Sequence, residues 1–89
     1  MKEVWVFHGV GSRFAGGVFS SRAQAEEFIS LYRLSGLLTN YPVGISAYDW
    51  AIQEKLFEPR KPEQYETSFI QRFTTASQEH YHYEDGRLD

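Results

Sequence analysis

Residues 4–29 read VWVFHGVGSRFAGGVFSSRAQAEEFI, and along them the spacing of apolar side chains changes from two residues to about 3.6. The period of two in residues 4–7 and 14–19 predicts two β-strands. The longer period after Ser21 predicts an α-helix. Strand, strand and helix in this order indicate an α+β fold.

The first predicted strand covers Lys2–His8 and has two apolar faces. Val4 and Val6 lie on one face, which His8 closes, while the intervening Trp and Phe side chains lie on the other. Because both faces are apolar, we expect this strand to be central in its sheet. A glycine-rich turn leads to the second strand, Arg13–Phe19.

The predicted helix begins at an N-cap, Ser20 or Ser21, and Ser21 has the spacing of a capping box with Gln24. An apolar stripe follows at i, i+3, i+4 and i+7, made of Ala25, Phe28, Ile29 and Tyr32. We expect this stripe to pack on the sheet and Gly36 to end the helix.

Beyond the helix, Leu37–Pro42 is predicted to be a loop or a short extended segment, and Gly44–Tyr48 to be the third strand. A helical crossover of this length permits the third strand to run parallel to the second, with the first between them. The predicted core is therefore a ββαβ sheet in the order 2-1-3.

Two short helices are predicted in the C-terminal half. One covers Trp50–Phe57, with Asp49 as its cap and Pro59 as its end. The other lies around Phe69, capped by Thr67 or Ser68.

A final strand is predicted over Gln78–Glu84, before a turn at Asp85-Gly86. With these elements, residues 1–89 are expected to form a single α+β domain, since this length supports one hydrophobic core.

The composition excludes several classes of function. The net charge of −3 argues against a nucleic-acid partner, because neutralising phosphates takes clustered Lys and Arg. No apolar run approaches the roughly 18 residues of a membrane span, and the N-terminus enters a strand without a signal-peptide core. With no cysteine there are no disulfides, no thiolate catalysis and no cysteine-based zinc site. We expect a cytoplasmic protein.

The segment His80–Glu84 has the richest chemistry. On a strand, His80, His82 and Glu84 project from one face, and two imidazoles with a carboxylate match the ligands of zinc, nickel or ferrous iron. His8 is the one further histidine available as a ligand. The competing interpretation is a polar strand edge facing solvent.

Other catalytic or cofactor motifs are absent. There is no Gly-x-Ser-x-Gly elbow, and the glycines at 9 and 11 lead into a strand, not into the helix N-terminus that a phosphate site requires. We expect no catalysis and no cofactor, apart from the alternative of a divalent transition metal.

The six tyrosines are too many to place easily in a core, because each buried phenol needs a hydrogen-bond partner. We expect four of them at the surface, as a partner-binding face: Tyr41, Tyr65, Tyr81 and Tyr83.

Several strings resemble a family of short, uncharacterised bacterial proteins, a domain of unknown function. They are VWVFHG (4–9), GVFSS (17–21), YPV (41–43), YDWA (48–51) and QEHYHYEDG (78–86). The likeness spans nearly the whole chain and implies a bacterial origin, but no catalytic residue. Residues 18–29 also resemble a broader set of small ββαβ proteins, which supports the fold alone.

Three functional hypotheses follow. The first is a non-catalytic cytoplasmic module that binds a protein partner, such as an immunity protein or a phage-related accessory protein. The second is a metal- or small-ligand-binding protein that uses the His-x-His-x-Glu strand. The third is a homodimer whose last strand pairs across a twofold axis, because a bare sheet edge invites such pairing.

Overall fold

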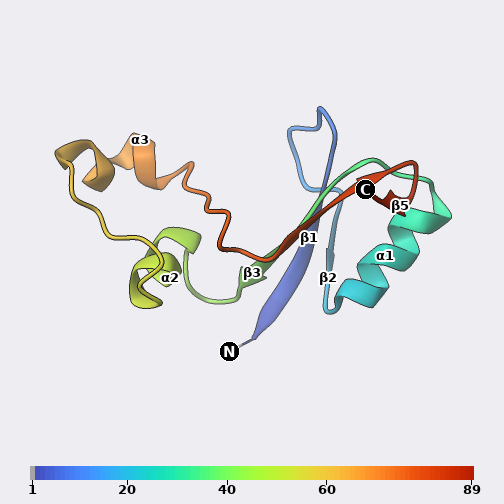
Figure 1. Cartoon of the computed structure of the whole chain (residues 1–89), viewed down its shortest axis with the longest axis horizontal. Helices are drawn as coiled ribbons and strands as arrows, with labels where there is room; N and C mark the ends of the chain where they lie inside the picture. Colours follow the sequence, from blue (N-terminus) through green and yellow to red (C-terminus); the bar gives the residue numbers. More distant parts are fainter. Residues whose placement is uncertain (1) are drawn as a thin grey trace.

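The chain forms an α+β fold built on one antiparallel sheet, in a computed structural model that describes residues 2–89. Within these residues the sheet has five strands in the order β2-β1-β3-β4-β5 (Figure 1). The strands are β1 (Glu3–Gly9), β2 (Gly17–Phe19), β3 (Gly36–Pro42), β4 (His80–Glu84) and β5 (Arg87–Leu88). Strands from both ends of the sequence therefore share one sheet, and β1 is central, as predicted.

One face of the sheet is covered by α1 (Arg22–Leu31), in agreement with the apolar stripe. The hydroxyl of Ser21 accepts a hydrogen bond from the backbone N–H of Gln24 at 3.1 Å. The Gln24 side chain in turn accepts from the backbone N–H of Ser20 at 3.1 Å, so the predicted capping box involves both serines. The helix packs into a core made of Trp5, Phe7, Ala25, Ile29, Leu38 and Tyr83.

The α1 helix ends at Leu31, with Tyr32 as its C-cap, and the prediction that Gly36 ends it is wrong. Arg33 takes the left-handed conformation, with φ of 54°. The N–H of Leu34 then bonds to the carbonyl of Ile29 at 2.9 Å, which is the 6→1 bond of a Schellman motif. Gly36 is left free to begin β3.

The third strand is not where the sequence pattern placed it. β3 occupies Gly36–Pro42, whereas Leu37–Pro42 is predicted above as a loop or a short extended segment. It pairs with β1 along seven residues, from Glu3↔Pro42 to Gly9↔Gly36. Gly44–Tyr48 instead leads into a helix, because Ser46 caps it. The order 2-1-3 is confirmed, and β3 runs parallel to β2 with β1 between them.

Smaller differences concern element boundaries. β2 is shorter than predicted, since only Gly17–Phe19 pairs with β1. The strand predicted at Gln78–Glu84 is β4, and it begins at His80. Gln78 lies before it in a turn, where its N–H bonds to the Thr75 carbonyl at 3.1 Å. At Asp85-Gly86 both residues have positive φ, 50° and 82°, and the turn adds a fifth strand as a hairpin.

Residues 43–79 form a helical arm with α2 (Ala47–Gln53), a 3₁₀-helix η1 (Pro62–Tyr65) and α3 (Thr67–Ile70). The α2 helix begins earlier than predicted, with Ser46 as its N-cap in place of Asp49. It ends at Gln53, well before Pro59, and Lys55 follows in the left-handed conformation with φ of 60°. The N-cap of α3 is Glu66, and neither Thr67 nor Ser68 caps the helix.

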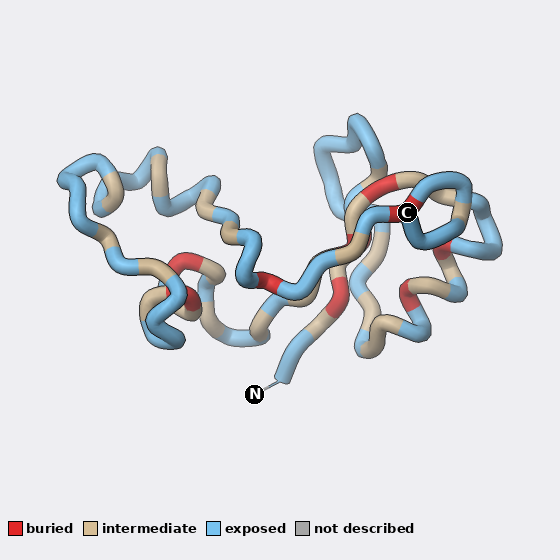
Figure 2. The backbone as a smooth tube through the Cα atoms, viewed as in Figure 1, coloured by how far each residue is buried: buried red, intermediate tan, exposed pale blue. Residues whose placement is uncertain are grey.

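The arm has its own small core, separate from the core beneath the sheet. Four aromatic rings pack together in it, with centroids 5.0–6.3 Å apart: Tyr48, Phe57, Phe69 and Phe73. Figure 2 shows buried segments in the sheet and α1, and another buried segment in α2.

The radius of gyration, 14.3 Å, exceeds the value of about 12 Å for a compact chain of this length. The molecule is therefore elongated, with extents of 44 × 28 × 19 Å. No helix among residues 2–89 combines the length and the apolar character needed to cross a membrane.

Candidate functional site

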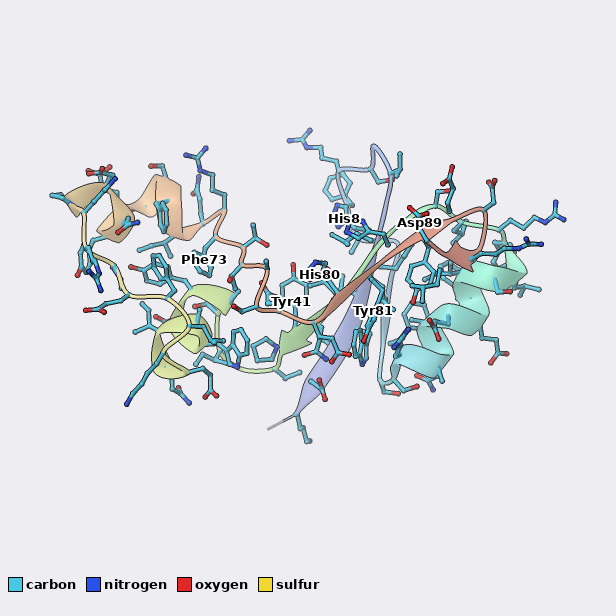
Figure 3. The ribbon with its side chains drawn as sticks, in the orientation of Figure 1. His8, Tyr41, Phe73, His80, Tyr81 and Asp89 are labelled. Atoms are coloured by element: carbon cyan, nitrogen blue, oxygen red, sulfur yellow. The ribbon has the colours of Figure 1, made fainter. Side chains whose placement is uncertain are left out.

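The face of the sheet opposite α1 is the main candidate site, and we call it the open face. Strand alternation and register place ten side chains on it: Val4, Val6, His8, Val18, Leu37, Thr39, Tyr41, His80, His82 and Glu84. None of them belongs to the core cluster, and Val18 remains 63% exposed. In Figure 3 the labelled His80 and Tyr41 lie on the side of the sheet toward the arm, and Tyr81 lies on the side toward α1.

The structure brings the predicted metal ligands to this one face. In the sheet register His82 is opposite Leu37, which is opposite His8, so the two histidines are two strands apart. His80 and His82 are closer, with ring centroids 5.8 Å apart. Glu84 projects from the same face of β4. Across residues 2–89, however, no three His, Asp or Glu side chains are placed to hold one metal ion together.

Part of the open face is hollowed into a pocket of about 680 Å³. Its lining includes His8, His82, Glu84 and the turn Gly9–Ser12. This volume is in the range of small-ligand pockets. The pocket therefore joins three of the four predicted ligands around one space, with a serine hydroxyl from the turn.

The four tyrosines predicted at the surface do not form one face. Tyr65 is 62% exposed in the arm, and Tyr41 is 36% exposed on the open face. Tyr81 is half-buried on the α1 side, and Tyr83 is only 5% exposed within the main core. The expectation that Tyr83 lies at the surface is wrong. Its hydroxyl donates a hydrogen bond to the Glu26 carboxylate on α1 at 2.6 Å, and this partner offsets the cost of removing the phenol from water.

The two buried-side tyrosines of β4 bind α1 to the sheet. The guanidinium of Arg22 lies 3.6 Å from the ring centroid of Tyr81, a close cation–π contact. Arg22 also pairs with Glu26 at 3.2 Å. Burial, together with the hydrogen bond to Glu26, raises the pKa of Tyr83 to about 12. These tyrosines hold α1 on the sheet and so have a structural role. The side chains of β4 that remain available for binding are those on the open face.

We predict an alkaline loss of stability from Tyr83. A phenol whose pKa is higher in the folded chain than its usual value of about 10 stabilises the fold below pH 10 and stops doing so as pH rises through about 12. The difference in free energy of unfolding between the wild type and Tyr83→Phe should therefore shrink between pH 10 and pH 12. Urea unfolding at several pH values measures it, and parallel pH curves for the two proteins would contradict the assignment.

Sequence reasoning missed the apolar centre of the open face. The sequence predicts a loop or a short extended segment at Leu37 and Thr39, which does not place them beside Val6 and the histidines. Only the pairing of β1 with β3 brings them together, and the doublet Leu37-Leu38 was the one local sign of a strand with two apolar faces.

The chain matches no curated protein and no solved structure. A family model described as a domain of unknown function (DUF7710) matches residues 4–89. The expectation of an uncharacterised family is thereby confirmed, and the chain belongs to the DUF7710 family.

Proposed function

We propose that the protein is a non-catalytic module that binds another protein chain through the open face. The observation that carries the proposal is the absence of charge from the centre of that face. The chain has 9 Lys and Arg and 12 Asp and Glu among 89 residues. The central positions of the open face are Val4, Val6, Val18, Leu37, Thr39 and Tyr41, and none of them is charged.

Depletion of charge at the centre, with aromatic and aliphatic side chains in its place, is the composition that distinguishes protein interfaces from other surface. His8, His80 and His82 border this centre and can form hydrogen bonds at the rim. The open face also extends well beyond the pocket at one end of it. This extent favours a protein over a small molecule as the main partner.

A small-ligand or metal-binding function is the second candidate, and the pocket beside His8, His82 and Glu84 favours it. It accounts for those three residues, for the turn Gly9–Ser12 and for Leu37, which also lines the pocket, but it leaves the other uncharged positions of the face without a role. For location we propose the bacterial cytoplasm, a choice supported by the lack of cysteine and by the family resemblance.

The experiment is affinity capture with the tagged protein and with Leu37→Lys, which places a charge at the centre of the open face. We expect the variant to bind the captured partner more than about tenfold more weakly, since centrally buried residues dominate interface energies. Leu31→Lys, at the 71% exposed last residue of α1, makes the same substitution away from the open face and should bind like the wild type.

Binding must then be reproduced with the purified partner, and the untagged chain itself is included as a partner to detect self-association. Circular dichroism establishes that Leu37→Lys is folded, and Val18→Lys, at an already exposed position, is a second variant of the same face. Equal affinity for the wild type and both open-face variants would overturn the proposal.

A further inference from the structure

His80 and His82 have the geometry of half of a metal site. They are exposed, they project from the same side of β4, and their ring centroids are 5.8 Å apart. Two imidazoles on one tetrahedral zinc ion have centroids about 5 Å apart, given Zn–N bonds of about 2.0 Å. A rotation of the two side chains that shortens the distance between the ring centroids by less than 1 Å would therefore reach the separation found at a zinc ion.

The orientation of His80 is already suited to a metal. Its Nδ1 lies 2.7 Å from the backbone carbonyl of Gln78. A carbonyl can only accept, so Nδ1 carries the proton and Nε2 keeps its lone pair for a ligand. Metal-bound histidines typically make this second contact, which selects the tautomer and orients the ring.

The carbonyl that orients His80 is itself held in place. Gln78 is 2% exposed, and its side-chain amide donates to the Asn40 carbonyl on β3 at 3.2 Å. The next residue, Glu79, accepts the backbone N–H of Asn40 at 2.9 Å. The contact from Gln78 to His80 is therefore part of the junction between arm and sheet, and not a contact of two mobile surface groups.

One chain supplies only two of the ligands that such an ion needs. His8 is separated from His82 by Leu37, and no group of three ligands forms within residues 2–89. The β5 strand pairs with Tyr83 and Glu84, and the N–H of Asp89 bonds to the His82 carbonyl at 2.9 Å, so the outer side of β4 lacks a strand partner only at His80 and Tyr81. A second molecule can reach it there.

We propose that His80 and His82 bind a zinc ion jointly with the same two residues of a second copy, which makes a twofold site of four imidazoles. The partner on the open face is then a second copy of this chain, and this inference rests on the proposed function. Leu37 and Thr39 lie directly opposite His82 and His80 in the register, on the same face of the sheet as the proposed ion. Imidazole nitrogen is a preferred ligand of zinc, and four such ligands complete its tetrahedral shell.

The test is sedimentation velocity and calorimetric titration of the full chain with zinc chloride. We expect a dimer that binds one zinc ion per two chains and that EDTA dissociates. His80→Ala and His82→Ala should each abolish the zinc-dependent dimer, while His8→Ala, the third histidine of the same face, should keep it. Circular dichroism checks that the exposed histidine variants remain folded.

Three results would overturn the shared site: no zinc binding, one zinc ion bound per monomer without association, or equal loss in all three histidine variants.

Leu37→Lys separates this inference from the proposed function. If zinc has no effect but partner capture still depends on Leu37, the protein-binding function stands and the zinc site fails. If zinc joins Leu37→Lys as well as the wild type, and partner capture is equally unaffected, the zinc site at His80 and His82 stands, whereas the uncharged centre of the open face has no role in binding and the proposed function fails.

Discussion

Replacing Gly36 with alanine should lower the free energy of unfolding by about 3 kcal/mol, the upper end of the effects of overpacking. A methyl group at this position would lie 2.3 Å from the carbonyl oxygen of His8 and 2.9 Å from the Cα of Gly9. Both are backbone atoms of the central strand, which cannot move aside as a flexible side chain would. The substitution forces β3 away from β1 at the end of their seven paired residues.

The matched control for this prediction is Gly16→Ala. A methyl group there would be 3.4 Å from the ring of Phe7, an ordinary contact distance, and the residue is exposed. We expect a change below about 0.5 kcal/mol, as for most surface substitutions. Urea unfolding followed by circular dichroism measures both variants. Similar stabilities for the two would show that the approach of β3 to β1 does not require glycine.

The first third of the chain was predictable because its signals are local. The alternation of Trp5 and Phe7, the serine caps and the spacing of Ala25 and Ile29 each report on neighbouring residues, and the structure confirms them. The order 2-1-3 followed from the length of the crossover. None of these inferences required knowledge of a distant contact.

The third strand was not predictable in the same way. Alternation reveals a strand when one of its faces is apolar and the other polar, but β3 has Leu37 on the open face and Leu38 in the core. When both faces of a strand are apolar, the sequence no longer alternates between apolar and polar residues. Gly44–Tyr48 shows a better alternation, yet Ser46 accepts the N–H of Asp49 at 3.0 Å and begins α2.

The candidate site was predicted in part, for a related reason. Alternation along β4 separates His80 and His82 from Tyr81 and Tyr83, and the structure shows this division. That Tyr83 is buried depends on Glu26, 57 residues away, which no local pattern reveals. The position of His8 beside the same face also depends on the register of three strands.

The helical arm should lose its structure independently of the sheet when Tyr48 is replaced by alanine. Tyr48 is 7% exposed, packs against Phe57, Phe69 and Phe73, and donates its hydroxyl to the Gln64 carbonyl at 2.8 Å. Removing a buried aromatic side chain typically costs about 3–5 kcal/mol. The arm has only this small cluster to oppose such a loss, because the main core lies wholly between α1 and the sheet.

Amide hydrogen exchange distinguishes the two parts of the chain. In Tyr48→Ala we expect protection to be lost in α2 and α3 and kept in β1, β3 and α1. Tyr48→Phe, which removes only one hydrogen bond, should weaken protection in the arm by about 1 kcal/mol. Loss of protection in both parts together would mean that arm and sheet unfold as one unit. If the arm unfolds alone, partner binding by Tyr48→Ala reports on the open face without the arm beside it, because the strands that carry Leu37 and His82 remain paired.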